Sequence, residues 1–269
     1  MKQILKSLTK VSGKEIISSE LAFATGKTDR DHVMALITQL RPRRTQRPLI
    51  RLGPATDGGY LVPDDLSGIL AVFSPGVSSE SGFEKDCAER SMDVFMADKS
   101  VDEPAESHPR FHFTKKFVGA LDDDSFMTLD EWTADSLSES SEGDLMLQMD
   151  IEGSEYESLL SVSTKLLCRY RILVVEFHQL NELWNRPFFN LASRVFTKLL
   201  QNHTCVHIHP NNEGGAYSRE QIEIPRAAEF TFLRNDRGLA ADYVSELPHP
   251  LDRDNTANPP LLLQPYWHG

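Results

Sequence analysis

The chain has 269 residues, of which 40% are hydrophobic and 25% are charged; this composition excludes a wholly disordered, collagen-like or coiled-coil protein. Its formal charge of -12, from 28 Lys and Arg against 40 Asp and Glu, opposes general attraction to nucleic acid or anionic lipid. The three cysteines form no CxxC pair and indicate neither a disulfide framework nor a thiolate zinc site, and no apolar stretch reaches the length of a membrane span. We therefore expect a cytoplasmic protein without membrane insertion.

Positive charge is concentrated at the start of the chain. Residues 1–51 contain 11 Lys or Arg and 4 Asp or Glu, so the other 218 residues carry 17 basic and 36 acidic side chains. These arginines can contact an anion or an acidic partner, or can form a solvated face that complements the acidic body. The group comprises Arg41, Arg43, Arg44, Arg47 and Arg51.

The predicted elements alternate along the chain. Helical spacing predicts a first helix over His32–Leu40, and a glycine-rich turn over Arg51–Tyr60 precedes a buried strand over Ile69–Phe73. The pattern then predicts, in order, helix Phe83–Glu89, strand Asp93–Asp98, strand Phe111–Val118, helix Ser125–Trp132, strand Leu145–Met149, helix Glu155–Leu160, strand Ile172–Val175, helix Phe189–Leu200, strand Cys205–Ile208 and strand Glu229–Leu233.

This alternation is typical of an α/β, doubly wound, mostly parallel Rossmann-like sheet with helices on both faces. The last two strands are joined by a loop rather than by a long crossover, which predicts an antiparallel edge strand. We expect a basic helical extension over residues 1–47, a main domain over residues 48–240, and a proline-rich tail over residues 241–269 that packs on this domain.

The loop after the first strand and the end of the next strand indicate a cofactor site. Gly76, Ser78 and Gly82 permit close backbone approach to a ligand, and Asp98 can accept hydrogen bonds from ribose hydroxyls. The same residues could instead form a tight turn and a solvated strand end. The spacing matches neither GxGxxG nor a P-loop, so this pair of features indicates an adenosine-containing cofactor without identifying it.

Ionisable side chains follow two further strands that should be neighbours. Asp150, Glu152, Glu176 and His178 each come after a buried apolar run, where charges are costly unless they face a cleft, a metal or a partner. His178 can act as a base oriented by Asp150 or Glu176, or Asp150 and Glu176 can hold a divalent cation. We do not expect zinc at the three histidines His203, His207 and His209, and we place the loop that follows them on the substrate side.

The chain resembles FkbM-type S-adenosylmethionine-dependent methyltransferases over roughly residues 48–235. The similar segments are Arg51-Leu52-Gly53 with Asp57-Gly58-Gly59-Tyr60, then Asp98, then Asp150-Ile151-Glu152-Gly153-Ser154-Glu155, and finally Glu176-Phe177-His178. The third segment is the most specific. The chain departs from many members at Ser74-Pro75-Gly76, where they carry an acid in the glycine loop.

The resemblance implies transfer of a methyl group from S-adenosylmethionine to a hydroxyl of a sugar or natural product. It implies catalytic roles for His178, Asp150 and Glu176, with Asp150 and Glu176 also available to Mg²⁺ or another divalent cation. The implied cofactor residues are Asp57, Gly58, Gly59, Gly76, Ser78 and Asp98.

Two other functions stay open at the level of sequence. One is a nicotinamide-dependent oxidoreductase, although the usual GxGxxG is missing, and the other is a non-catalytic Rossmann-like binding module. We expect a small-molecule or glycan acceptor and no nucleic-acid partner, and the sequence is compatible with a homo-oligomer.

Overall fold

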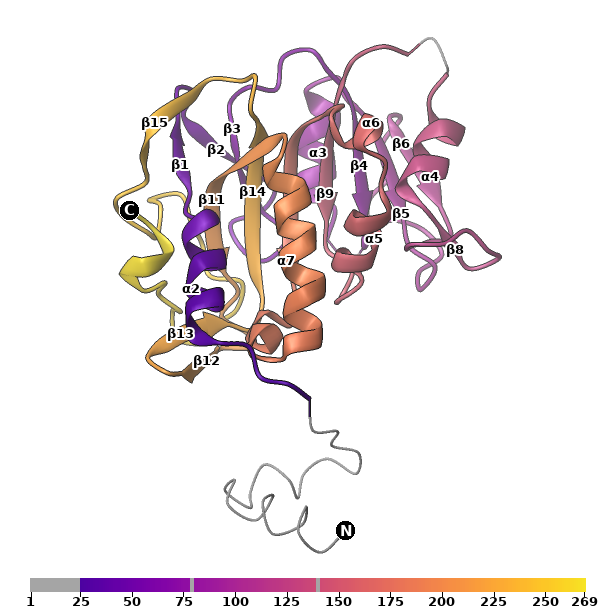
Figure 1. Ribbon diagram of the computed structural model, residues 1–269. Coiled ribbons are helices and arrows are strands. Elements are labelled where there is room, and N and C mark those ends of the chain that lie inside the picture. The colour runs from indigo at the N-terminus through magenta and orange to yellow at the C-terminus, as the bar shows by residue number, and fades with distance from the viewer. Residues whose placement is uncertain (1–24, 78–79, 139–140) are drawn as a thin grey trace, which may run out of the picture.

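The computed structural model describes residues 25–77, 80–138 and 141–269. Its central feature is a seven-stranded sheet with the strand order β11-β14-β10-β9-β4-β5-β6 (Figure 1). The strands are β4 (Ile69–Pro75), β5 (Asp93–Ala97), β6 (Phe111–Thr114), β9 (Asp144–Met149), β10 (Tyr170–Phe177), β11 (His203–Pro210) and β14 (Ala228–Arg234).

This sheet confirms the predicted α/β, doubly wound, mostly parallel Rossmann-like architecture. The strands from β6 to β10 pair in parallel, whereas β14 runs antiparallel to both β10 and β11. The predicted antiparallel strand is therefore β14, which lies one position inside the edge, with β11 outermost. The chain returns after β11 through the hairpin of β12 (Ala216–Arg219) and β13 (Ile222–Pro225), so β14 runs in the opposite direction.

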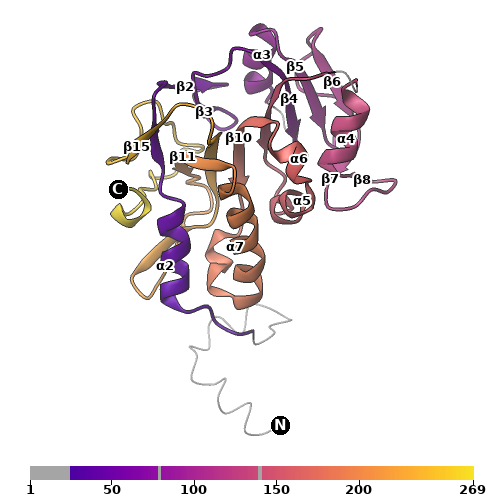
Figure 2. The ribbon, with the colours of Figure 1, turned by 45° about the horizontal axis from the view of Figure 1, so that its top comes forward.

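Helices cover one face of the sheet, and one helix with a hairpin covers the other (Figures 1 and 2). The amphipathic helix α7 buries Ala192, Val195, Phe196 and Leu199, which recur at helical spacing, against the first face. Here α2, α4, α5 and α7 share one core cluster, while α3 packs in a second cluster with the hairpin β2–β3. The bounds are α2 (Arg30–Gln39), α3 (Gly82–Glu89), α4 (Leu129–Ser136), α5 (Glu155–Ser161), α6 (Thr164–Leu167), α7 (Arg186–Leu200), β2 (Leu49–Leu52), β3 (Tyr60–Pro63) and the 3₁₀ helices η1 (Leu180–Trp184) and η2 (Pro265–Trp267).

Two predicted elements differ from the structure. The single strand predicted over Phe111–Val118 is divided into β6 and β7 (Phe117–Val118), and β7 pairs with β8 (Phe126–Met127) outside the main sheet. The helix predicted from Ser125 begins later, because Asp123 Oδ1 accepts hydrogen bonds from two amides of a tight turn and Thr128 caps α4 by accepting from Glu131 N. Local side-chain hydrogen bonds thus override the helical spacing.

Outside the main sheet, a strand near the start of the described chain pairs with a strand near its end. Strand β1 (Arg43–Thr45) pairs antiparallel with β15 (Leu239–Tyr243), and the tail then continues to Trp267, which is buried. The domain boundaries expected from the sequence stay predictions, and the start of the basic extension, residues 1–24, lies outside the described residues. Among the described helices, none has the length and apolarity that a bilayer span requires.

Candidate active site

Six of the predicted site residues line cavities at the edge of the sheet where the parallel strands end, namely Asp57, Gly76, Asp98, Asp150, Glu176 and His178. In doubly wound sheets this edge holds the ligand, because the loops that leave the strands separate there. Two cavities open at it, of about 450 and 480 Å³. Both are lined by Asp150 and Glu152, from the turn after β9, so the two cavities adjoin.

The first cavity contains Asp98. Ser100 donates two hydrogen bonds of 2.6 Å to Asp98 Oδ1, from its backbone N and its Oγ, and no hydrogen bond from a described residue reaches Oδ2. The carboxylate is therefore fixed in orientation and keeps an oxygen for a ligand. Apolar walls come from Phe117, Val118 and Phe126.

Gly76 also lines this cavity, but its backbone explains why a glycine is needed. Its φ is +93°, and a Cβ atom there would lie 1.6 Å from the backbone oxygen of Asp150. The loop after β4 thus packs directly against the turn after β9, and Asp150 N donates to Pro75 O at 3.3 Å. The predicted contact at Ser78 lies outside the described residues.

The Asp57-Gly58-Gly59 segment is not part of the Asp98 cavity. Asp57 lines the second cavity, while Gly59 packs against Arg51 and Pro54, where a Cβ atom would lie 2.1 Å from Pro54 O. Arg51 holds this loop by donating to Pro54 O at 2.6 Å and to Thr56 O at 2.7 Å. In the described chain, Gly58 and Gly59 thus shape the loop that carries Asp57.

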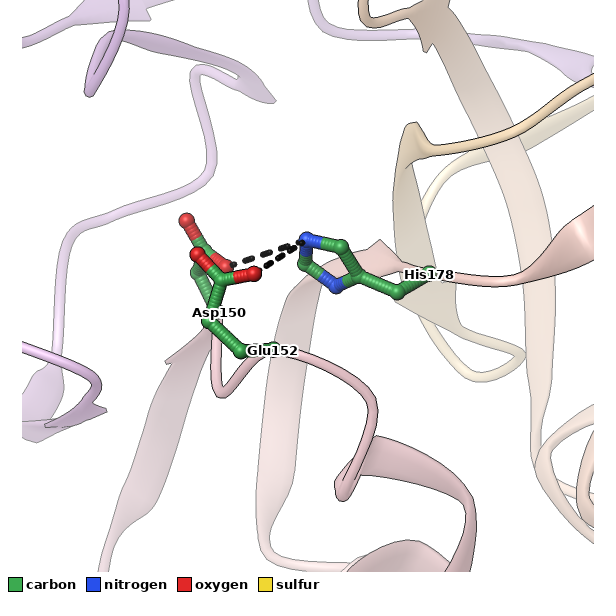
Figure 3. A group of neighbouring side chains, drawn as sticks. All are labelled: Asp150, Glu152 and His178. Atoms are coloured by element: carbon green, nitrogen blue, oxygen red, sulfur yellow. Dashed lines mark ion pairs between the residues drawn. The ribbon is translucent and has the colours of Figure 1, made fainter. Parts of the chain in front are cut away.

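The second cavity is strongly acidic and contains His178. The ring is held by Glu155, whose side chain is fully buried and whose Oε1 accepts from His178 Nδ1 at 3.0 Å and from Gly153 N at 2.9 Å. This contact leaves Nε2 facing the cavity, 3.5 Å from Glu152 and 3.8 Å from Asp150 (Figure 3). Glu152 has φ of +55°, an uncommon conformation for a side chain of its type, in the tight turn that brings it there.

The carboxylates determine the protonation of this cluster. Burial alone lowers the pKa of His178, but the hydrogen bond that His178 donates to Glu155 and the charges of Glu155, Glu176 and Asp150 raise it to about 9. Burial raises the pKa of Asp150 to about 7, against the favourable charge of His178. Near neutral pH, His178 therefore carries a proton and Asp150 lies near its titration midpoint.

A second acidic group lies beside the first, on neighbouring strands. Glu176 on β10 is directly opposite Glu229 on β14, and both side chains are buried. Asn211 donates to Glu176 at 2.8 Å, and the Nδ2 atom of Asn255 lies 2.9 Å from both Asp57 and Glu229. Burial raises the pKa of Glu176 well above its usual range and that of Glu229 to about 7.

Among the residues that the structure describes, two sets of side chains have ligand atoms close enough together to hold a cation. Within each set the ligand atoms lie within 4.8 Å of one another. The predicted metal residues Asp150 and Glu176 fall in different sets. The sets are Asp150, Glu152 and His178, and Asp57, Glu176 and Glu229.

Four residues of the site had no role assigned from the sequence. Glu155 ends the motif that contains Asp150 and Glu152, but its contact with His178, 23 residues further along the chain, could not be derived from spacing. Asn211 belongs to the loop predicted to lie on the substrate side, and Glu229 begins an apolar strand. Asn255 has no sequence signal, since only the packing of the tail brings it to Asp57.

Comparisons with known proteins add little to this geometry. No family model and no curated protein matches the chain. Among solved structures, the chain is similar to the 23S rRNA methyltransferase ErmE, with 10% sequence identity and a TM-score of 0.34, over 80% of this chain and 71% of that one.

Proposed function

We propose that the protein is an S-adenosylmethionine-dependent methyltransferase of the FkbM type that methylates a hydroxyl of a sugar or natural-product acceptor. The observation that supports this most is the pair of cavities that adjoin at Asp150 and Glu152. One has an oriented carboxylate suited to a ribose, and the other has a histidine and carboxylates suited to handling a hydroxyl proton. Methyl transfer requires such a junction, because cofactor and acceptor must meet in line.

The cavity with Asp98 fits the cofactor. Its volume of about 450 Å³ falls in the range of small-molecule sites, and it combines apolar walls with one oriented carboxylate. When bound, S-adenosylmethionine supplies an electrophilic methyl group on a positively charged sulfur. Asp98 Oδ2 would accept hydrogen bonds from ribose hydroxyls, and Phe117 and Phe126 would contact the base.

The acceptor hydroxyl must lose a proton, and two groups can receive it. Asp150, whose pKa is about 7, is ionised just above neutral pH, whereas His178, whose pKa is about 9, keeps its proton there. We infer that Asp150 accepts the proton at neutral pH while His178 donates from Nε2 to the acceptor oxygen. Glu155 holds the ring in this orientation. Glu176 lines the same cavity and favours the protonated ring only when its own carboxylate is ionised, which burial opposes by raising its pKa well above its usual range.

We also propose that a divalent cation such as Mg²⁺ can bind to Asp150, Glu152 and His178, since their oxygen and nitrogen ligands can converge. A bound cation would lower the pKa of a coordinated acceptor hydroxyl. His178 Nε2 cannot hold a proton and a cation together, so cation affinity should rise with pH. Titration calorimetry with Mg²⁺ and Mn²⁺ near pH 7 and near pH 9 measures this directly.

Calorimetry with S-adenosylhomocysteine tests the cofactor assignment. We expect the protein to bind it, and Asp98→Asn to weaken binding about tenfold or more, because hydrogen bonds to a charged acceptor are lost. The matched control is Asp102→Asn, which changes an exposed aspartate paired with Lys115 outside the cavity lining. A heat of binding with NADH, together with none for S-adenosylhomocysteine, would refute the methyltransferase proposal and favour an oxidoreductase.

The pH dependence of turnover tests the proton acceptor. If Asp150 accepts the proton, kcat/KM for a hydroxyl substrate that the protein methylates rises through about pH 7, and Asp150→Asn removes that rise. With His178 as the base, the rise lies near pH 9 and disappears in His178→Gln. The variant His178→Gln should keep its affinity for S-adenosylhomocysteine, because His178 does not line the cofactor cavity. Asp150→Asn should keep most of this affinity, because Asp98 and not Asp150 carries the ribose contact.

A further inference from the structure

The arginine-rich stretch noted in the sequence surrounds a third cavity. This cavity, of about 390 Å³, lies between β1 with the loop that follows it, strand β11, and the tail after β15. Arg43, Arg44 and Arg47 line it. It shares no lining residue with the two cavities of the candidate active site.

The three arginines do not pair with the acidic body of the protein. Within the described part of the chain, no carboxylate oxygen forms an ion pair with any of them, whereas Arg171, Arg234 and Arg237 all have such partners. A basic face that merely complements the acidic body would place carboxylates against its guanidinium groups. Arg47 acts on Asp65 only through longer-range charge attraction, and Asp65 is already paired with Arg171 and Arg237. The guanidinium groups that line the cavity are therefore available to an anion.

The other two arginines of the stretch have structural roles. Arg41 donates to the backbone oxygen of Tyr266 at 3.0 Å, and Arg51 donates to carbonyls of its own loop. Arg43 lies over the ring of Tyr243, 5.3 Å from its centroid, which fixes its stem beside the cavity. The stretch therefore divides into two arginines that hold backbone and three that line the cavity.

The remaining lining residues determine what kind of anion fits. Arg44 donates to Ser245 Oγ at 3.2 Å, so a hydroxyl donor or acceptor lies next to one guanidinium. Glu246 is the one carboxylate among the lining residues, so three positive charges stand against one negative charge. The floor is apolar and includes the buried Val206 and the half-buried Leu49.

We propose that this cavity binds a phosphate group carried on a small organic molecule. The excess of two positive charges matches a phosphate dianion, and guanidinium groups form paired hydrogen bonds with phosphate oxygens. The apolar floor would contact the body of the ligand. This site is independent of the proposed methyl transfer, because it shares no lining residue with the two cavities of the candidate active site.

Calorimetry in phosphate-free buffer, with pyrophosphate, inorganic phosphate and a hexose phosphate as probes, tests the site. We expect the wild-type protein to bind at least one probe, and the double variant Arg44→Gln/Arg47→Gln to bind about tenfold more weakly for each arginine removed. The matched control is Arg194→Gln, an exposed arginine on α7 with no ion pair in the described chain, which should bind as wild type does. Tighter binding of the hexose phosphate than of inorganic phosphate assigns the ligand an organic body.

Two results would overturn the proposal. One is no heat from the wild-type protein with any probe at about 10 mM, a concentration that detects even millimolar affinity. The other is equal weakening in Arg194→Gln and in the double variant, since that indicates general charge attraction. Affinity for S-adenosylhomocysteine, measured on the same samples, shows that the variants fold and keeps this test separate from that of the methyltransferase function.

Discussion

Replacing Glu155 by glutamine removes the charge that most strongly holds the proton on His178. Glu155 is fully buried, and its Oε1 lies 3.0 Å from His178 Nδ1. Burial lowers the pKa of His178, and the hydrogen bond and charge of Glu155 lead the contributions that raise it from 6.5 to about 9. At about 1.4 kcal/mol for each pKa unit, this rise stabilises the protonated folded state by about 3 kcal/mol. We expect Glu155→Gln to lower the pKa of His178 by at least about one unit.

The sign of the linked stability follows from the raised pKa. The folded protein binds the His178 proton more tightly than the unfolded chain, so the contribution is complete below about pH 6.5 and is lost as pH rises through about 9. The difference in unfolding free energy between wild type and Glu155→Gln should therefore be larger near pH 6 than near pH 9.5, by about 1.4 kcal/mol or more.

Two measurements check this expectation. Nitrogen-15 NMR titration of the imidazole gives the pKa of His178, and urea unfolding at both pH values gives the stability difference. Glu157→Gln, an exposed glutamate on the same helix, is the matched control and should leave both unchanged. A wild-type His178 that titrates near 6.5, or a pKa that stays near 9 in Glu155→Gln, would contradict the proposed site electrostatics.

Gly76→Ala should destabilise the protein by about 3 kcal/mol or more in urea unfolding, because its Cβ would overlap the backbone oxygen of Asp150. Gly215→Ala, which has a positive φ of +65° but nothing within 4 Å, should cost only about 1 kcal/mol, and equal losses would refute the packing argument. Asp252→Asn should cost about 3 kcal/mol and speed proteolysis of the tail, because the buried carboxylate accepts from His207 Nε2 at 2.8 Å. Since the pKa of Asp252 is depressed despite burial, this loss should persist down to about pH 4 and shrink in stronger acid; a loss that does not change with pH would argue against the ion pair.

Much of the sheet, and the edge where we expect a ligand, could be predicted from the order of residues alone. Apolar runs such as Leu145–Met149 and Ile172–Val175 predict buried strands because their residues need cover on both faces. Polar residues that directly follow such runs, including Asp98, Asp150 and His178, must then lie at the carboxyl ends of parallel strands. The spacing of the strands and their parallel connections thus predict that these residues share one edge of the sheet. The structure confirms the fold on which this prediction depends.

Which of these residues face one another depends on the folded chain. Glu155 reaches His178 because the turn after β9 packs beside the end of β10, and Glu229 reaches Glu176 because β14 inserts next to β10. Asn255 comes from a tail almost 200 residues from Asp57 in the chain, with a separation of 198 positions. Contacts of this kind depend on strand order and on the path of irregular segments, which local propensity does not encode. The same holds for the protonation of His178, because a pKa depends on burial and on neighbouring charges that exist only in the folded chain.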